Sequence, residues 1–530
     1  HGGVVVGACR LLDGICAQVD SKIWKEELPA FREQTDAFYA GELNKGAYKG
    51  FSGYYGSYAQ KDGKASMLRL RMPAGRVTRE RLAFVARTVR EYGVPRVHFT
   101  TCQTMQLHDL TPENLYPIME EALDAGIVIM GGGGDFPRNV MCSPLSGLEQ
   151  GEYFDVLPWA EAAGDYLLQF IKAEKMPRKL KVGFSNSPAN RTHATYRDLG
   201  FVARPDGTFD VYSAGGLGNN PRFGVKVGEA VAPEKILYYI KAMWLTFRAY
   251  GNYENRGRAR TRYMQEACGG PEAYAKAYAE KLAEVFAGEK LELDVTPHPV
   301  TKKDDGIRIK GRWVIPQKQN ALYAVAWHPL GGQPDLSVLC ALSDLLSGME
   351  EAEIRLAPDE TAYIVNLTGG EAEKVLKLLE KDNARTLFET SVSCIGSATC
   401  QVGLRDSQGL LAACAKAVRE AGIPDGALPQ IHISGCPSSC GTHQTGILGF
   451  RGASRMVDKK PQSGFTLYAG GCEGQGEEQM GRELGVLLEK DIPAFLVDLG
   501  RKVAESGKDF YAWYAANPQG IEEAAAPYLG

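Results

Sequence analysis

Apolar and polar residues alternate most clearly from Ser66 to Arg71, where leucines take one face of a predicted strand and arginines the other. Residues 78–92 place apolar side chains at helical spacing and are followed by a glycine. Residues 97–107 favour an extended segment, and Thr111-Pro112 opens a second helix. This order of strand, helix, strand and helix predicts half of an α/β sandwich.

The same pattern returns in the second half of the chain. Residues 98–110 align with residues 355–367, and each segment runs into a predicted helix, the second with the capping box Thr368-Gly-Gly-Glu371. Further on, Asp198-Leu-Gly-Phe201 aligns with Ile447-Leu-Gly-Phe450. These matches keep the same order along the chain, which indicates an internal duplication.

Between these matches, Leu180–Gly183 falls on Ile431–Ser434. Chance similarity between two α/β segments is the alternative interpretation. The ordered series of matches favours one long repeat used twice over a solenoid, which needs several short units.

Four cysteines stand in two pairs near the C-terminal end. Cys394 and Cys400 have the spacing C-x5-C, Cys436 and Cys440 have the spacing C-x3-C, and thirty-five residues separate the pairs. Thiolates at four corners suit zinc or an iron–sulfur cluster, and ordinary buried thiols are the third interpretation. Structural zinc sites favour shorter arms, so the longer arm fits a wider iron–sulfur cubane better.

These motifs resemble the signature of a known family. Ser434-Gly-Cys-Pro-Ser-Ser-Cys-Gly441, preceded by Cys394-x5-Cys400, resembles the sirohaem and [4Fe-4S] signature of nitrite and sulfite reductases. The resemblance implies that all four cysteines hold the cubane and that Cys440 also bridges to the sirohaem iron. The family places an acidic residue seven positions after the last cysteine, where this chain has Ile447.

The resemblance also implies the fold class, a mixed α+β chain with pseudo-twofold symmetry. Ferredoxin-like half-domains accompany two domains that bind sirohaem and the cluster. Glycine-rich and proline-rich stretches mark the predicted boundaries. We expect an N-terminal arm or loop region at 1–60, paired half-domains at 61–130 and 305–390, a first-repeat sirohaem and substrate domain at 131–304, and a second-repeat cluster and sirohaem domain at 391–530.

Basic residues stand where the family keeps its substrate ligands, namely Arg69, Arg138, Lys179 and Lys181. Strand alternation puts both lysines on one face, with Leu180 turned away. A bound oxyanion needs cations that neutralise it and donate protons as its S–O or N–O bonds break. A solvated strand end is the alternative for the two lysines. The resemblance implies that the four basic residues and Cys440 are catalytic.

Sirohaem is rich in carboxylates, so its pocket needs cations and hydrogen-bond donors. Besides Cys440, the candidate contacts are Arg71, Thr100, Thr101, Gln103, Gln106, Asn139, Arg178, Gly215 and Gly216, with added charge from Arg256, Arg258 and Arg260. The family pattern has arginines where this chain has His98 and Cys102. Other protein groups or water must therefore bind some of the sirohaem carboxylates. Cys102 is either an extra thiol near the iron centre or a small buried filler.

The resemblance implies a reductase in which the cluster passes single electrons through the Cys440 sulfur to sirohaem. The pair Lys179 and Lys181 favours the six-electron reduction of sulfite to sulfide, because a doubly charged anion is held by a second cation. Nitrite reduction to ammonia is the alternative from the same centre. A zinc-organised binding module is the alternative from another class. The family's common electron donor is ferredoxin, so we expect a separate carrier protein of that kind.

The amino-acid composition limits the classes of binding partner that the protein is expected to have. The 530 residues are 44% hydrophobic and 23% charged with a formal net charge of −4, which indicates no general attraction to nucleic acid or membranes. No apolar run is long enough for a membrane span, and the first residues lack the layout of a signal peptide. Cysteines with metal spacing suit a reducing compartment, so we expect a cytoplasmic protein.

Overall fold

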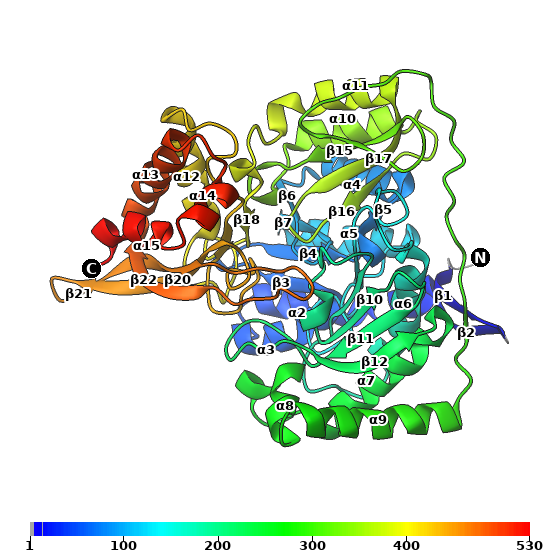
Figure 1. Cartoon of the computed structure of the whole chain (residues 1–530). Helices are drawn as coiled ribbons and strands as arrows, with labels where there is room; N and C mark the ends of the chain where they lie inside the picture. Colours follow the sequence, from blue (N-terminus) through cyan, green and yellow to red (C-terminus); the bar gives the residue numbers. More distant parts are fainter. Residues whose placement is uncertain (1–4, 13) are drawn as a thin grey trace.

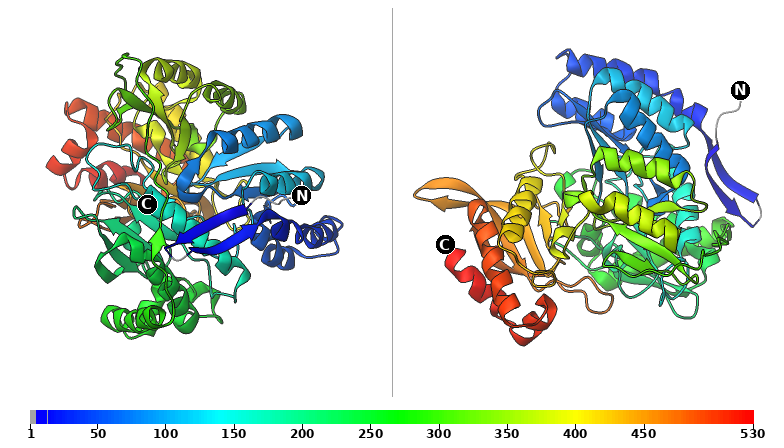
Figure 2. Two further views of the ribbon diagram at one scale, coloured as in Figure 1. Left: turned by 90° about the vertical axis from the view of Figure 1, so that its right-hand side faces the viewer. Right: turned by 90° about the horizontal axis from the view of Figure 1, so that it is seen from above.

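The computed structural model describes residues 5–12 and 14–530. The chain forms two ferredoxin-like layers that share one core, a large first-repeat sheet, and a C-terminal lobe around a second large sheet (Figures 1 and 2). The lobe lies at one side of the molecule, with its long β20–β21 hairpin (Leu448–Val457 and Lys460–Ala469) projecting outwards. This arrangement is the mixed α+β fold that we predicted.

The first half-domain follows the predicted order of elements. Its antiparallel sheet has the strand order β3-β4-β7-β6. The helix predicted over residues 78–92 begins at Arg79, with Thr78 capping it through its side chain, and ends before Gly93, which is in the left-handed conformation. The elements are β3 (Ser57–Ala59), β4 (Ser66–Leu70), α4 (Arg79–Tyr92), β6 (Arg96–Phe99), β7 (Met105–Leu110) and α5 (Pro112–Asp124).

The second half-domain repeats the first residue by residue. His98 pairs with Gln106 across the first hairpin, and the equivalent Arg355 pairs with Tyr363. Its sheet has the order β14-β15-β17-β16-β5, and the capping box at Thr368 is present. The elements are β5 (Arg76–Val77), β14 (Val314–Pro316), β15 (Leu322–Trp327), α10 (Leu336–Leu346), β16 (Glu353–Leu356), β17 (Ala362–Thr368) and α11 (Gly369–Leu379).

The two larger sheets share one topology. The orders are β12-β11-β10-β9-β8 and β22-β21-β20-β19-β18, and in each sheet the first three strands in chain order are parallel and the last two antiparallel. The further strands are β8 (Met141–Cys142), β9 (Val182–Ser185), β10 (Leu199–Ala203), β11 (Phe209–Ser213), β12 (Val225–Val231), β18 (Val392–Ser393), β19 (His432–Ser434) and β22 (Arg482–Leu488).

Two equivalent glycines, one in each repeat, support the duplication, because each lies where a loop crosses very close to a strand. A Cβ atom on Gly200 of β10 would overlap the carbonyl oxygen of Ala194, and one on Gly449 of β20 would overlap that of His443. Each carbonyl stands six residues before its glycine, so a loop crosses closely over each strand. Only glycine fits there.

The strand register corrects one detail of the predicted repeat. Gly200 pairs with Gly183, whereas Gly449 pairs with His432. Gly183 is therefore equivalent to His432, and the predicted alignment of Leu180–Gly183 with Ile431–Ser434 was shifted by two residues. The error arose because short apolar strands match equally well in neighbouring registers of the same parity.

The N-terminal segment is more ordered than the arm or loop region that we expected. It forms the helices α1 (Ser21–Lys25), α2 (Leu28–Tyr39) and α3 (Lys45–Ser52), after the strands β1 (Val5–Leu11) and β2 (Gly14–Asp20). Trp24 and Phe31 are buried in the core shared by the half-domains. The glycines and tyrosines around α3 hid the helical pattern, and packing on the core outweighs their weak propensity.

The segment between β12 and β13 is mostly helical. The helices α7 (Ile236–Tyr250), α8 (Met264–Ala267) and α9 (Pro271–Gly288) leave a basic run, Arg256, Arg258, Arg260 and Arg262, in the connection between α7 and α8. After β13 (Leu293–Asp294), residues 295–313 run along one edge of the molecule from α9 to β14 (Figure 1). The other helices are α6 (Leu157–Leu168), α12 (Ser407–Glu420), α13 (Ile492–Glu505), α14 (Phe510–Ala516) and α15 (Gly520–Ala525).

The close crossing at Gly449 gives a stability prediction. We expect Gly449→Ala to lower the free energy of unfolding by about 3 kcal/mol, because the added methyl group overlaps a backbone oxygen that cannot move independently. Urea denaturation followed by circular dichroism measures this value. The matched control is Gly50→Ala in α3, where a Cβ meets no atom within 4 Å. An equal loss in both variants would contradict the explanation.

Candidate functional site

The two cysteine pairs lie on loops that leave neighbouring parallel strands. Cys394 directly follows β18, and the Cys436 loop follows β19. The loops touch, because Arg405 N–H donates to Gly435 O at 3.0 Å and Gly435 N–H donates to the Cys394 sulfur at 3.2 Å. The carboxyl ends of adjacent parallel strands form a natural crevice for a bound group.

Charge interactions place three of the thiols in one neighbourhood. Burial, and secondarily the charge of Cys440, raises the pKa of Cys394 to about 12. Burial also raises the pKa of Cys440, with Lys181 and Lys179 opposing it and Cys436 adding to it. Cys400 lies on the same loop as Cys394, where its N–H donates to Gly396 O at 2.8 Å.

The described cysteines do not form a compact single-ion site. Within the described part of the chain, no group of three or more histidine, cysteine or acidic side chains is placed to hold one metal ion. A zinc ion needs its ligands close together in a tetrahedron. A cubane binds one thiolate per iron corner and accepts a wider spacing.

The predicted basic residues converge on the same region. Arg69 comes from β4 and donates to Gly132 O, and Arg138 donates to Gly134 O at 3.0 Å. Leu180 is fully buried in the first-repeat core, so Lys179 and Lys181, which flank it just before β9, project from the opposite side. The Cys440 thiolate interacts electrostatically with both lysines. The substrate-side cations and the cysteine loop therefore face one another.

Mutual repulsion and burial weaken the protonated forms of these cations. Burial and Arg69 lower the pKa of Arg138 to about 10. Burial, Lys181 and Arg260 lower the pKa of Lys179 well below its usual value. The Cys102 thiolate raises the pKa of Lys181, but burial with Arg260 and Arg197 outweighs it, so the net shift is downward.

Sequence reasoning missed two members of this cluster, Arg197 and Asp198. Arg197 interacts with Cys102 and Arg260. Asp198 is 2% exposed and accepts the N–H of Lys181 at 2.7 Å and the guanidinium of Arg260 at 3.4 Å. Both residues precede the duplicated Leu-Gly-Phe strand, and that position was the available signal. Asp198 is the carboxylate that positions the lysine segment.

Other predicted cofactor contacts bond to the protein itself. Gln103 bonds to Cys142 and to Leu356 O, and Thr100 bonds to Thr104 across the turn between β6 and β7. Gly215 avoids a clash with the backbone of Tyr196. Gly216 forms a bridge with Arg222. Thr101 lies in the same turn as Thr100. These residues shape the walls, and a direct cofactor contact from them stays a prediction.

The remaining predicted contacts differ in their surroundings. Gln106, with its amide oxygen turned to Arg69, accepts from that guanidinium at 3.1 Å. Arg71 donates to two backbone carbonyls, and Asn139 donates to Cys102 O at 3.1 Å. Arg178 has a buried Nε without a hydrogen-bond partner in the described structure. From the basic run, Arg260 joins the cluster while Arg256 pairs with Asp135.

His98 and Cys102, which replace family arginines, have distinct roles. His98 bonds to Glu360 at 2.7 Å, and Glu360 accepts the N–H of Ser393 at 2.8 Å. Burial lowers the pKa of His98 to about 4 and raises that of Glu360, so burial disfavours the charged form of each partner. This bond ties the first repeat to the strand that precedes Cys394.

Cys102 accepts a hydrogen bond from the Lys181 ammonium at 3.4 Å. Burial raises the pKa of its thiol, but Lys181, Arg197, Arg69 and Lys179 together outweigh burial and lower the pKa to about 6. Cys102 is therefore an anionic group within the basic cluster rather than an inert filler.

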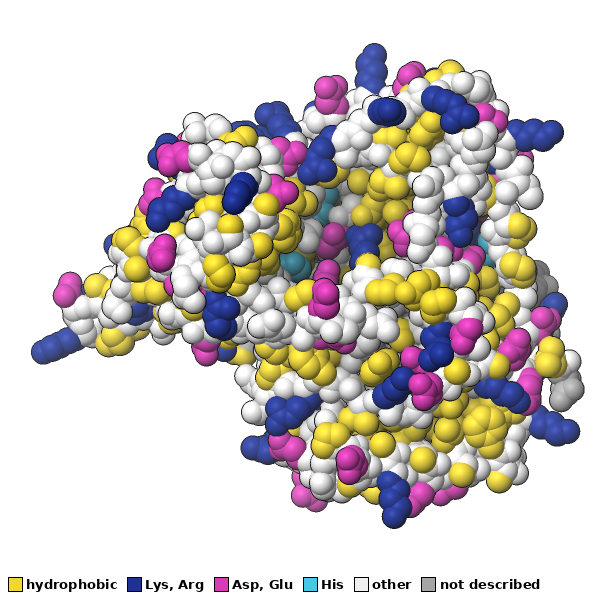
Figure 3. Space-filling model, in the orientation of Figure 1, with side chains coloured by type: hydrophobic (Ala, Val, Ile, Leu, Met, Phe, Trp, Pro, Cys, Tyr) yellow, Lys and Arg dark blue, Asp and Glu magenta, His cyan; other side chains and the backbone are white. Residues whose placement is uncertain are grey.

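The donor set fits an anionic iron cofactor. Arg69, Arg71, Arg138, Lys179, Lys181 and Arg197 bring positive charge to one partly buried region, and Asp198 with Cys102 offsets only part of it. Buried charge without a partner is costly, so this region needs anions from outside the chain. The carboxylates of sirohaem and an oxyanion substrate are such groups. Figure 3 shows a hollow where the C-terminal lobe meets the rest of the molecule.

Comparisons with known proteins agree with this chemistry. Residues 133–286 match the nitrite and sulphite reductase 4Fe-4S domain, and residues 58–125 match the nitrite/sulfite reductase ferredoxin-like half domain. Both matches are to the nitrite and sulfite reductase family, and they support that family for this chain. Members of this family are oxidoreductases, and sirohaem and a [4Fe-4S] cluster, the cofactors predicted for this chain, are those of the family.

The curated relatives of the reductase are named either as nitrite reductases or as sulfite reductases. A ferredoxin–nitrite reductase of Synechococcus elongatus is 27% identical over 460 residues, covering 82% of this chain and 85% of the relative. A sulfite reductase [NADPH] hemoprotein beta-component of Bacillus licheniformis is 25% identical over 490 residues, covering 80% and 81%. The solved structure of the Mycobacterium tuberculosis NirA protein has a TM-score of 0.75 at 22% identity, covering 93% and 96%, which shows the fold.

The low pKa of Cys102 can be measured directly on the cofactor-free reductase. We expect iodoacetamide to modify Cys102 at neutral pH and to lose this reactivity only as the pH falls below about 6, because four cations hold the thiolate. Mass spectrometry of tryptic peptides follows the modification. Lys181→Met removes the nearest cation and should move the reactivity to higher pH. Cys394 serves as the unreactive internal reference, and equal pH dependence of the two thiols would contradict the assignment.

Proposed function

We propose that the reductase catalyses the six-electron reduction of sulfite to sulfide at a sirohaem and [4Fe-4S] centre. The observation that supports sulfite is the pair Lys179 and Lys181, which stand together in an incompletely neutralised basic cluster opposite Cys440. Sulfite carries more negative charge than nitrite, so a second ammonium stabilises it more strongly.

Four thiols are proposed to hold the cofactors, namely Cys394, Cys400, Cys436 and Cys440. When bound, these cofactors supply single electrons to the oxyanion. The amide of Gly435 donates to the Cys394 sulfur at 3.2 Å and so opposes the effect of burial on that thiol. The missing single-ion geometry among the described side chains removes support from the zinc-organised module.

The basic residues have two tasks in this proposal. Arg69 and Arg138 remain charged and orient the anion. Lys179 and Lys181 are held near one another and have lowered pKa values, so their ammonium groups donate protons more readily near neutral pH. Asp198 keeps the lysine segment in place through the N–H of Lys181.

Nitrite is the second candidate, and Cys102 favours it. A thiolate beside the Lys181 ammonium offsets one positive charge, which leaves a cluster better matched to a singly charged anion. The nitrite name of the Synechococcus elongatus relative agrees with this alternative.

A ferredoxin-type protein is the proposed electron donor, because the Synechococcus elongatus relative carries that name. Among the described residues, no helix combines the length and apolar character needed to cross a membrane. The cytoplasmic location stays a prediction.

Substrate preference is tested by Lys181→Asn. We expect kcat/KM for sulfite to fall about tenfold more than kcat/KM for nitrite, because the lost charge acts more strongly on the more highly charged anion. Steady-state rates with a chemically reduced dye as donor give both constants. The exposed Lys416→Asn on α12 is the charge-matched control. An unchanged ratio in Lys181→Asn would remove the argument for sulfite.

The role of Cys440 is tested by Cys440→Ser. We expect the purified variant to lack a coupled centre, because the serine hydroxyl is a poor ligand for iron compared with a thiolate. Iron content, visible absorption and dye-linked turnover report the loss. Cys414→Ser, at a thiol buried in the α12 core, controls for a general effect of removing a cysteine. Normal turnover in Cys440→Ser would reject the bridging role.

A further inference from the structure

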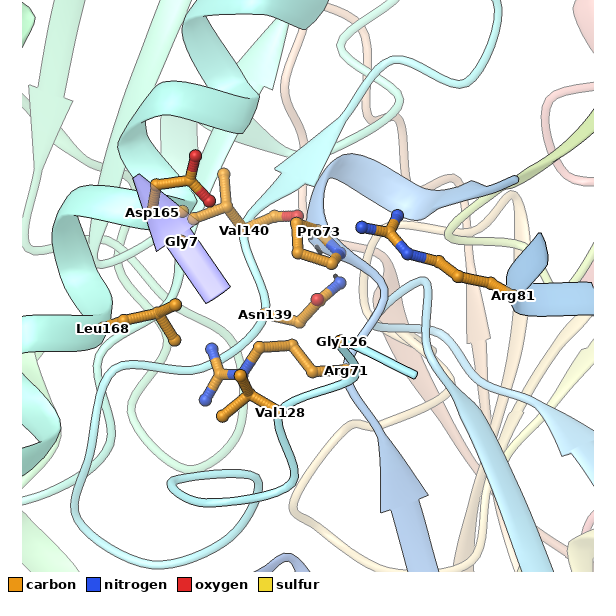
Figure 4. A pocket seen from close by; sticks show the side chains of 11 residues that line it. Gly7, Arg71, Pro73, Arg81, Gly126, Val128, Asn139, Val140, Asp165 and Leu168 are labelled. Carbon is orange, nitrogen blue, oxygen red and sulfur yellow. Dashed lines mark hydrogen bonds between the residues drawn. The ribbon is translucent and has the colours of Figure 1, made fainter. Parts of the chain in front are cut away.

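A cavity lies beside the basic cluster, with Arg71 in its wall. Its volume is about 150 Å³. Figure 4 shows side chains from the segment after β4, from α4 and α6, and from the Asn139 segment around it. The polar groups at its wall are Arg71, Arg81, Asn139 and Asp165. It holds roughly five waters at the volume that water occupies in the liquid.

Two buried atoms indicate what fills this cavity. The Nε of Arg71 and the Oδ1 of Asn139 have no hydrogen-bond partner in the described structure, although the residues are only 6% exposed each. The Nδ2 of Asn139 donates to Cys102 O and Gln103 O, which fixes Oδ1 as the free acceptor. An anion would satisfy Arg71 but would repel Oδ1. Water satisfies both, because it donates and accepts.

The same two residues form the wall shared with the basic cluster. Arg71 interacts electrostatically with Arg138 and Arg69. Asn139 follows Arg138 in the chain and bonds to the backbone of Cys102, whose sulfur contacts Lys181. The Arg71 and Asn139 side chains therefore stand between the cavity and the cluster.

Asp165 is the carboxylic acid side chain that lines the cavity. It projects from α6, and the charged groups that face it are Glu161 on the same helix and Arg81 on α4. Residues 73–75, β8 and β9, which also pack on α6, contain no charged side chains. The other elements packed on α6 do contain charged residues: Arg10 in β1, Asp20 at the end of β2, Lys172 after α6, and Lys241 and Arg248 in α7. Burial and Glu161 raise the pKa of Asp165 to about 7, and Arg81 opposes them. A carboxyl group in this environment exchanges protons with water under ordinary conditions.

We propose that this cavity is a water-filled proton reservoir for the reductase site, with Asp165 as the acid that recharges it. The proposal rests on the proposed function, because reducing either oxyanion consumes at least one proton for each electron. The Asp165 O–H bond breaks as its proton passes to cavity water. The proton then passes from the cavity water, between Arg71 and Asn139, to a lysine amine that has given up its own proton. The Asp165 carboxylate takes its next proton from solvent. Arg71 stays protonated and orients the water.

Asp165→Asn tests the acid, and Asp165→Glu is the matched variant that retains it. On the cofactor-free chain, infrared difference spectra should show a carboxylic-acid carbonyl band that disappears as the pH rises through about 7 in the wild type. The band should be missing in Asp165→Asn. With the reduced-dye assay, we expect Asp165→Asn to turn over about tenfold more slowly than the wild type below pH about 6. The two enzymes should converge at higher pH, where the wild type has also lost this proton, and the solvent deuterium isotope effect should rise in the variant.

Arg81→Met provides a test that does not require Asp165→Asn to fold. Removing the opposing cation raises the pKa of Asp165, so both the infrared transition and the pH profile should move to higher pH by about one unit. An active wild type whose pH profile is unchanged in Asp165→Asn and in Arg81→Met would overturn the reservoir. A wild type that reduces neither sulfite nor nitrite would instead overturn the proposed function, while the infrared titration would still report the state of Asp165.

Discussion

The structure depends on a concentration of positive charge that the protein does not fully neutralise. Arg69, Arg138, Lys179 and Lys181 repel one another, and the lowered pKa values of Arg138, Lys179 and Lys181 record burial together with repulsion from neighbouring cations. A folded chain tolerates such a cluster when rigid surroundings hold it and when anions complete it on binding. Binding of the cofactor carboxylates and of the substrate relieves this repulsion, and the relief adds to their binding free energy. Affinity for anions is therefore built into the fold.

Internal duplication provides the rigid surroundings. The two halves repeat the same sheets, the same left-handed backbone positions and the same close glycine contacts, so each half presents a similar crevice. The two halves differ in the side chains that they place in this crevice. The first contributes lysines and arginines, and the second contributes cysteine loops. Polar contacts cross between them, such as His98 with Glu360 and His193 with Glu473 at 2.7 Å each. These contacts hold the cationic and thiol sides in a fixed relation.

The departures of this chain from its family pattern have a common effect. Replacing two arginines by His98 and Cys102 removes fixed positive charge near the cluster. His98 is neutral and serves the interface between the repeats, while Cys102 adds a negative charge that partners Lys181. The balance between cations and anions in the site is therefore set by tertiary contacts. That balance distinguishes a site for a doubly charged anion from one for a singly charged anion.

The sequence alone determined the duplication, the half-domain elements with their caps, the four cysteine positions and the two lysines on one strand face. These features are local or periodic, so the spacing of residues along the chain encodes them. Only the tertiary structure showed that Asp198 positions the lysine segment, that Cys102 contacts Lys181 and that Asp165 faces a polar cavity. It also turned the expected N-terminal loop into helices. Each of these outcomes depends on groups far apart in the chain, whose burial and mutual charge exist only after folding.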